Sequence, residues 1–346
     1  MPLSVGEPAP WFTAPTPSNP EFAFDTAAGR YVLLLFLPAD PERRFLTMKA
    51  LAANQSLLDD ARISAFVVMR DPAAVAGARD LRGLRWFLDA DGAVSRLYGA
   101  GGVEGPAWML LDPTLRLMGQ ATAEKAEGVF RTLRTLPQPA DHAGVPLVAP
   151  VLVLPRVFDP GLCERLIALL EAGDAAFSGV MRDVGARTVA VMDEHKKRRD
   201  VTVADTALRD EIRQALSARL FPQIRHAFQF QVTEIERYLV ARYDAAEGGV
   251  FRAHRDNTTR QTANRKFACS INLNDDFAGG DLRFPEFGPA LHRPPAGGAL
   301  VFSCSLLHEV VPVTAGRRYA FLPFFYDEDG ARILEAYRRS VAAGPS

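Results

Sequence analysis

The spacing of hydrophobic and polar positions changes along the chain and divides it into two halves. In the first half, a continuous apolar run over residues 31–37 ends at Pro38 and indicates a strand that is covered on both faces. Helical and strand-like stretches then alternate, with a helical stretch at 45–60 and strand-like stretches at 64–69 and 108–111. This alternation predicts an α/β layer fold for residues 1–136.

The second half begins with helices and continues with short strands. Asp159 followed by Pro160 is typical of a helix start, and leucine or isoleucine every fourth residue over 208–220 predicts an amphipathic helix. Beyond Glu234, short apolar or alternating stretches are separated by Gly, Pro, Asn and Asp. They lie at 235–243, 266–273, 280–284, 298–303 and 318–325. Together they favour an α+β domain whose core, residues 234–327, is a double-stranded β-helix or jelly roll.

A proline-rich segment separates the halves. Five prolines fall between Pro137 and Pro155, and they remove backbone donors that a helix or sheet would need. We therefore expect a linker at 137–150 and a second domain at 151–346.

Composition restricts the partners. The 40 basic and 41 acidic residues give a net charge of −1, which favours neither nucleic acid nor an anionic membrane surface. The N-terminus lacks a signal-peptide pattern, and no apolar run reaches the roughly 20 residues of a membrane span. The three cysteines, Cys163, Cys269 and Cys304, form neither a disulfide framework nor a paired metal motif. A reducing cytoplasm is the expected location.

Candidate metal ligands occur in the predicted strand region. Residues i and i+2 of a strand point to one face, so His254 and Asp256 would present an imidazole and a carboxylate together. His308 follows the apolar run at 299–302 and would add a second imidazole. Two imidazoles and one carboxylate form the facial set that holds a divalent iron and leaves other positions open. Taken alone, His254 and Asp256 are more typical of a surface histidine and a turn residue, and it is His308, Arg318 and the strand context that favour a metal site.

The ordered set of motifs resembles the iron(II)- and 2-oxoglutarate-dependent dioxygenases of the prolyl 4-hydroxylase-like group. The resemblance covers about 157–326 and is carried by Arg242-Tyr243, His254-Arg255-Asp256, Gly279 to Phe284, His308 to Val313, and Gly316 to Tyr319. It implies that His254, Asp256 and His308 bind iron, and that Arg318 binds the far carboxylate of 2-oxoglutarate. It also implies that Tyr243 donates a hydrogen bond to that carboxylate.

Alternatives remain for several of these positions. Arg317 would replace Arg318 if the strand register moved by one residue, and Tyr243 could instead fill core. Asn272 stands where some relatives have a tyrosine. Cys269 and Cys304 are expected in the core or at the pocket wall, and the polar loop 257–265 at the pocket mouth or in solvent.

The first half resembles a peroxiredoxin of the thioredoxin fold, on the motifs at 5–12, 36–40 and 98–99. The family's chemistry does not carry over, because Phe45 stands at the position of the attacking cysteine and Glu42 at that of the threonine. A thiolate is the attacking species in that reaction, and phenylalanine offers none. We expect a non-catalytic module for docking or dimerisation, or a scaffold, and an edge strand here would permit a homodimer.

The function predicted from these resemblances is hydroxylation of an unactivated C–H bond in a peptide, an amino acid or a small metabolite. Iron(II), 2-oxoglutarate and dioxygen are the implied cofactors, with ascorbate left open as a reductant. The alternative is an oxygen- or redox-sensing interaction protein, in which the first half recruits a partner and the metal half is slow or inactive.

Overall fold

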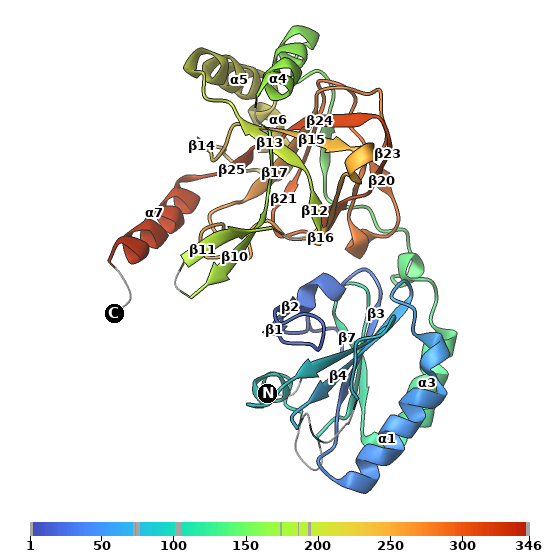
Figure 1. Cartoon of the computed structure of the whole chain (residues 1–346). Coiled ribbons are helices and arrows are strands. Elements are labelled where there is room, and N and C mark those ends of the chain that lie inside the picture. Colours follow the sequence, from blue (N-terminus) through green and yellow to red (C-terminus); the bar gives the residue numbers. More distant parts are fainter. Residues whose placement is uncertain are drawn as a thin grey trace. The chain divides into compact units, whose positions relative to one another are not determined.

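The computed structural model describes residues 3–71, 73, 77–100, 105–173, 175–185, 187–192 and 195–343. Two compact units are present, one formed by Met1–Val148 with Pro285–Pro289 and the other by Ala149–Phe284 with Ala290–Ser346. Figure 1 shows the elements of both units. Among the described residues, no helix is long and apolar enough to cross a membrane.

The first unit is built on a five-stranded mixed sheet in the order β5-β4-β3-β6-β7. The central strand β3 pairs in parallel with β4 and antiparallel with β6. The strands are β3 (Tyr31–Phe36), β4 (Ile63–Met69), β5 (Leu84–Leu88), β6 (Trp108–Leu111) and β7 (Leu117–Ala121), with β1 (Thr13–Ala14) and β2 (Phe22–Ala23) forming a separate hairpin. The helices are α1 (Pro41–Ala53), α2 (Ala93–Leu97) and α3 (Ala126–Thr135). The predicted α/β layering is therefore present.

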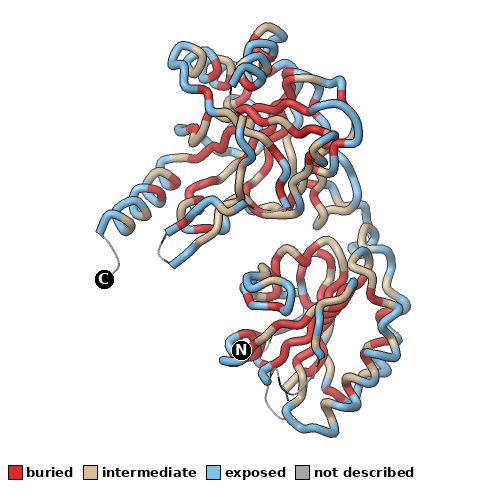
Figure 2. Tube along the Cα trace, in the orientation of Figure 1, coloured by how far each residue is buried: buried red, intermediate tan, exposed pale blue. Residues whose placement is uncertain are grey.

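Both faces of this sheet are covered, which explains the continuous apolar run of β3. On one face, Leu51 of α1 and Phe130 of α3 belong to one core with β3. On the other face, Phe24, Phe66 and Phe87 pack ring against ring. Every residue of β3 is consequently buried, as the buried colour along this strand in Figure 2 shows.

Helix α1 begins earlier than the predicted stretch at 45–60 and ends at Ala53. The side chain of Asp40 accepts a hydrogen bond from the Arg43 backbone N–H, and Pro41 occupies the first turn. Both features favour a helix start, so local capping decides this boundary. Phe45 lies on the solvent side of α1 with 65% of its surface exposed.

Asp60 provides a test of stability in the first unit. Burial raises the pKa of this carboxyl, but hydrogen bonds from Arg85, Gly83 and Ser64 outweigh it and bring the pKa down to about 2. A lowered folded-state pKa contributes stability above the unfolded value and loses it as pH falls, here from about pH 4 to about pH 2. The size is about 2 kcal/mol.

We therefore expect Asp60→Asn to lower the free energy of unfolding of the first unit by about 2 kcal/mol at pH 7 and by little at pH 2. Asn tolerates the left-handed backbone of this residue, whose φ is 66°. All three tryptophans, Trp11, Trp86 and Trp108, lie in this unit, so urea unfolding followed by their fluorescence reports it selectively. Glu127→Gln is the control, because Glu127 forms an exposed ion pair with Arg131 that should contribute little to stability. An equal loss at pH 2 and pH 7 would contradict the electrostatic origin.

The second unit contains two larger antiparallel sheets. One has nine strands, in the order β14-β25-β17-β24-β15-β13-β9 with β21 and β8 attached through β17. The other has five, in the order β12-β16-β22-β19-β20. The first sheet uses β8 (Leu152–Leu154), β9 (Ala176–Phe177), β13 (Arg199–Thr202), β14 (Glu234–Ile235), β15 (Leu239–Asp244), β17 (Phe267–Asn272), β21 (Ala299–Ser303), β24 (Arg317–Phe321) and β25 (Phe324–Tyr326). The second uses β12 (Lys196–Lys197), β16 (Val250–His254), β19 (Leu282–Arg283), β20 (Leu291–His292) and β22 (His308–Val310). This β-rich architecture agrees with the predicted jelly roll.

Smaller elements complete the second unit. Two small two-stranded antiparallel sheets are present: β10 (Val180–Val184) pairs with β11 (Arg187–Val191), and β18 (Ala278–Gly279) pairs with β23 (Val313–Ala315). The helices are α4 (Pro160–Ala172), α5 (Thr206–Arg219), α6 (Phe221–Phe228) and α7 (Glu328–Ala342). Asp159 caps α4 as the sequence predicts. The expected strand at 235–243 is instead split into β14 and β15.

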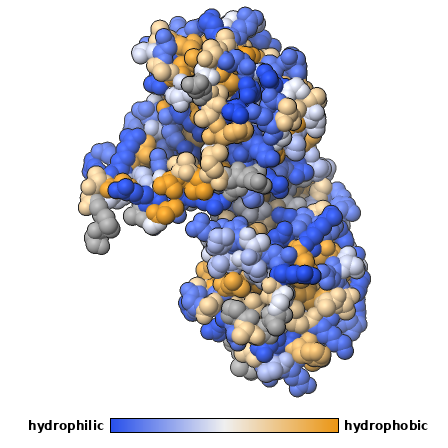
Figure 3. All heavy atoms as spheres, viewed as in Figure 1, coloured by the Kyte–Doolittle hydropathy of each residue, from blue (hydrophilic) through white to orange (hydrophobic). Residues whose placement is uncertain are grey.

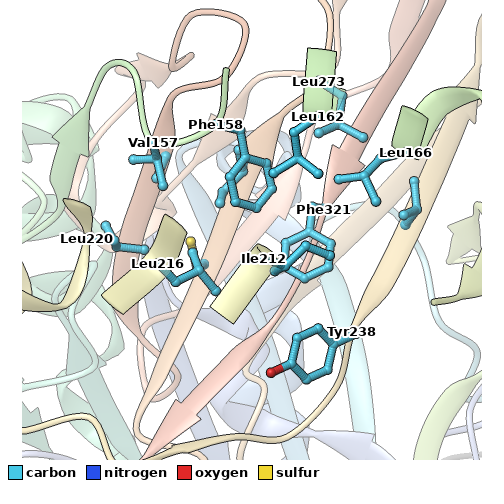
Figure 4. Close-up of a cluster of buried hydrophobic side chains, with 14 of the residues drawn as sticks. Val157, Phe158, Leu162, Leu166, Ile212, Leu216, Leu220, Tyr238, Leu273 and Phe321 are labelled. Carbon is cyan, nitrogen blue, oxygen red and sulfur yellow. The ribbon is translucent and has the colours of Figure 1, made fainter. Parts of the chain in front are cut away.

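The helices α4, α5 and α6 cover the outer face of the nine-stranded sheet. Figure 4 shows Leu162, Leu166, Ile212 and Leu216 from these helices gathered against Phe321 of β24. This packing leaves the opposite face of the sheet free to line the interior of the roll. The space-filling view in Figure 3 shows hydrophobic residues scattered among hydrophilic ones on the visible face.

Candidate metal centre

Two strands of the five-stranded sheet bring the predicted metal ligands together. His254 is the last residue of β16 and His308 the first of β22, and the two are directly paired across these strands. A register shift lies between Phe251 and His254. The sequence predicts His254 and Asp256 on the same strand. The strand instead ends at His254, and Asp256 lies in the turn that follows. A backbone hydrogen bond of 3.0 Å from Asp256 N to Cys304 O holds this turn.

The three side chains are close enough to share one ion. One potential ligand atom from each of His254, Asp256 and His308 lies within 4.8 Å of the others. The Asp256 carboxylate oxygens lie 3.6 Å from His254 Nε2 and 3.3 Å from His308 Nε2. His308 is buried, and the other two side chains are mostly buried. Two imidazole nitrogens and a carboxylate oxygen are suitable ligands for a divalent iron.

Backbone carbonyls set the orientation of both imidazoles. His254 Nδ1 lies 2.7 Å from the Arg252 carbonyl, and His308 Nδ1 lies 3.0 Å from the Leu306 carbonyl. A carbonyl oxygen only accepts, so each Nδ1 carries the proton and donates it. Each Nε2 then presents its lone pair to the cluster, which is the form that binds a metal. The sequence could not identify these acceptors, which stand two residues before each histidine.

The electrostatics favour the ligating protonation states. Burial, followed by the nearby His308, lowers the pKa of His254 to about 4, so the ring is neutral at pH 7. Burial raises the pKa of Asp256, but the two histidines outweigh it and hold that pKa well below its usual value. A neutral imidazole and an ionised carboxylate are the species that a metal requires.

Aromatic rings form the walls around the cluster. The Phe251 ring stacks on His254 with 3.5 Å between centroids, and the Phe302 centroid lies 4.5 Å from that of His308. Phe284 packs against Phe302 at 5.0 Å. These rings keep the ligands in fixed positions and exclude water from their sides.

A buried guanidinium lies in the same roll. Arg318 of β24 has 1% of its surface exposed, donates from Nε to Asn272 Oδ1 at 3.0 Å, and donates from Nη2 to Ser270 Oγ at 2.7 Å. Its Nη1 is buried without a hydrogen-bond partner among the described residues. Among the described residues, Arg318 forms no ion pair with a carboxylate, whereas its neighbour Arg317 pairs with Asp244. A buried arginine with a free donor and no counter-ion provides a place for an anionic ligand.

The neighbouring arginine faces outward. Arg317 donates from Nε to Asp244 Oδ2 at 2.8 Å, and half of its side chain is exposed. Adjacent residues of a strand point to opposite faces, so only Arg318 enters the roll. Of the two arginines left open by the sequence, the structure places Arg318 inside.

Tyr243 lies directly opposite Arg318 across the pairing of β15 with β24. Only 1% of the tyrosine is exposed, and Arg198 Nη1 lies 3.4 Å from its hydroxyl oxygen. Ser270, Asn272 and Arg198 were not assigned roles from the sequence. The signal for two of them was available, because Ser270 and Asn272 are polar residues at i and i+2 on the otherwise apolar β17.

The loop 257–265 is less exposed than a solvated loop. Its buried members are Thr259, Thr262, Asn264 and Arg265. Arg265 pairs with Glu236 and donates from Nη1 to the Asp256 carbonyl at 3.2 Å. The loop therefore supports the turn that carries Asp256.

The cysteines are core residues. Cys163, Cys269 and Cys304 are all buried, and none is paired in a disulfide. Burial raises the pKa of Cys163 to about 11 and also raises that of the other two thiols. These thiols are protonated at neutral pH and are poor nucleophiles.

Comparison with known proteins supports the same chemistry. A PKHD-type hydroxylase of Stenotrophomonas maltophilia (strain R551-3) is 29% identical over 157 residues, which cover 43% of this chain and 68% of the relative. A PKHD-type hydroxylase of Verminephrobacter eiseniae is 35% identical over 94 residues, covering 25% of this chain and 40% of the relative. The predicted enzyme class, a 2-oxoglutarate- and iron(II)-dependent hydroxylase, is confirmed.

No family model matches the chain. Among solved structures, a prolyl hydroxylase from Trichoplax adhaerens aligns with a TM-score of 0.41 and 17% identity, over 54% of this chain and 87% of that one.

Proposed function

We propose that the second unit binds iron(II) through His254, Asp256 and His308, binds 2-oxoglutarate through Arg318, and hydroxylates an organic substrate. The observation that carries the proposal is the combination of a compact ligand cluster with a buried arginine that lacks an anionic partner among the described residues. When bound, iron and 2-oxoglutarate would allow dioxygen to hydroxylate a C–H bond, with one oxygen atom entering the substrate and the other entering succinate as 2-oxoglutarate loses carbon dioxide.

The protein contributes fixed positions for the ligand side chains and a site from which water is largely excluded. The Nδ1 contacts fix the two imidazoles, and the turn at Asp256 fixes the carboxylate. Asn272 and Ser270 accept hydrogen bonds from Nε and Nη2 of Arg318, so that Nη1 remains available to a ligand carboxylate. A planar guanidinium stays charged when buried and suits a carboxylate in a narrow pocket.

We also propose that the first unit is a peroxiredoxin-like module of the thioredoxin fold without peroxidase activity. The exposed Phe45 at the position of the attacking residue supports this, as does the absence of any cysteine from residues 1–148. A thiol peroxidase needs a thiolate in this unit.

We propose a peptide, an amino acid or a small metabolite as the substrate class of the second unit. Two PKHD-type hydroxylase relatives support a hydroxylase reaction but do not select among these substrates.

Anaerobic titration with iron(II) and 2-oxoglutarate tests the proposal. We expect a visible charge-transfer band that requires both components and is absent when either is omitted. Candidate substrates are then supplied with air, and hydroxylation is recognised as a mass gain of one oxygen atom together with succinate. Folded protein that forms no band would refute the cofactor assignment and would favour the alternative of an interaction protein.

A further inference from the structure

Tyr243 lies between two buried guanidiniums that have different surroundings. The Arg198 Cζ is 5.8 Å from the centre of the tyrosine ring, and the Arg318 Cζ is 5.4 Å from it. Arg198 has 3% of its surface exposed, and Tyr243 and Arg318 each have 1%. The three side chains therefore form one buried row inside the roll.

The charge of Arg198 is already compensated. Its Nε and Nη2 each lie 2.6 Å from one oxygen of Asp200, in a bidentate pair. Burial raises the pKa of Asp200, but Arg198 outweighs it and lowers that pKa, so the carboxylate stays ionised. Among the described residues, Arg318 has no such carboxylate partner. The two arginines therefore differ. Arg318 can give its uncompensated positive charge to a ligand, whereas Arg198, already neutralised by Asp200, mainly contributes an oriented hydrogen-bond donor.

The oriented donor of Arg198 forms a hydrogen bond with the tyrosine. Arg198 Nη1 lies 3.4 Å from the Tyr243 hydroxyl oxygen. Arginine has no acceptor, so it must donate, and the hydroxyl must accept with a lone pair. The hydroxyl proton is then left for another acceptor, and the described residues provide none for it. Tyr243 pairs with Arg318 across β15 and β24, and the Arg318 Cζ lies 5.4 Å from the tyrosine ring centre, so the hydroxyl and the free Nη1 belong to the same buried region.

We propose that Arg198, held by Asp200, is a positioning residue that keeps the Tyr243 hydroxyl proton directed to the far carboxylate of 2-oxoglutarate. The inference rests on the proposed function, because it requires that carboxylate to lie at Arg318. Asp200 fixes the guanidinium, the guanidinium occupies the acceptor side of the hydroxyl, and the tyrosine acts as a pure donor. Arg198 itself does not touch the cosubstrate.

A double-mutant cycle with Arg198→Lys and Tyr243→Phe tests this chain of contacts. Lysine keeps a positive charge next to Asp200. Its single ammonium cannot, however, donate hydrogen bonds to both Asp200 and Tyr243 in the planar geometry of the guanidinium. The full-length iron(II) protein is titrated anaerobically with 2-oxoglutarate to measure binding. In a separate assay in air, its slow substrate-independent conversion of 2-oxoglutarate to succinate gives KM and kcat.

We expect Tyr243→Phe to weaken 2-oxoglutarate binding about 10-fold and Arg198→Lys to weaken it about 3- to 10-fold, with kcat at saturation changed less than about 2-fold. The double variant should bind no more weakly than Tyr243→Phe, since Arg198 acts through the hydroxyl. Arg199→Lys is the matched control, because the neighbouring Arg199 pairs with Glu247 and contacts neither Tyr243 nor Arg318 in the described contacts. It should bind like the wild type.

Additive losses in the double variant, or wild-type binding by Arg198→Lys, would overturn the inference. If Arg198→Lys does not fold, Asp200→Asn takes its place in the cycle, because it frees the guanidinium at constant side-chain size. Failure of the wild type to bind 2-oxoglutarate would instead refute the proposed function, so the two failures are distinguishable.

Discussion

Asp256→Ala is expected to weaken iron(II) binding by at least about 100-fold and to abolish turnover. Loss of a residue that only supports a metal ligand already costs about 10- to 100-fold, and Asp256 supplies the one anionic ligand atom of the proposed set. Its oxygens lie 3.6 Å from His254 Nε2 and 3.3 Å from His308 Nε2, and a neutral imidazole cannot replace its negative charge. Equilibrium dialysis of iron(II) under anaerobic conditions measures the effect.

The control for this variant is Asp275→Ala, which removes an exposed carboxylate from the same unit. It should bind iron like the wild type. Circular dichroism establishes that both variants are folded. Iron binding by Asp256→Ala at wild-type affinity would remove Asp256 from the ligand set.

Arg318→Met is expected to weaken 2-oxoglutarate binding by about 2 to 5 kcal/mol, or at least about 30-fold, while iron(II) binding stays near the wild-type value. Methionine fills most of the volume but offers no donor to a carboxylate. Wild-type protein with iron should gain thermal stability when 2-oxoglutarate is added, by about 2.7 kcal/mol at 100 times Kd. The variant should gain much less.

Arg317→Met provides a matched control one residue away. Its side chain is half exposed and pairs with Asp244 on the outer face, so cosubstrate affinity should change less than about 3-fold. Anaerobic titration of the three proteins decides the assignment. If Arg317→Met showed the large loss and Arg318→Met did not, the carboxylate would bind outside the roll.

The types of candidate metal ligand, two imidazoles and a carboxylate, could be predicted from the sequence because the residue type alone determines which ligand atoms a side chain offers. Three candidate ligand side chains and an arginine ten residues after the second histidine are visible in the sequence itself. Their geometry is not, since the strand carrying His254 stops before Asp256, and a turn bonded to Cys304 brings the carboxylate into place. Such a turn depends on residues distant in sequence.

The supporting residues were harder to find for a related reason. The imidazole acceptors are backbone carbonyls, which every residue has, so no residue type marks them. Arg198 and Asp200 form a buried pair that a strand pattern does not separate from a surface pair. Helix α4, by contrast, was predicted with its correct start, because its cap and first-turn proline are local.

The pairing of β16 with β22 has a consequence for synthesis of the protein. His254 leaves the ribosome long before His308, and Arg318 follows later still. A nascent chain that ends before β22 holds at most one imidazole and one carboxylate of the proposed set, which makes a weak and exchangeable ligand pair. We therefore expect tight metal loading to follow completion of the last strands, so that a truncated product would carry no tightly held redox-active iron.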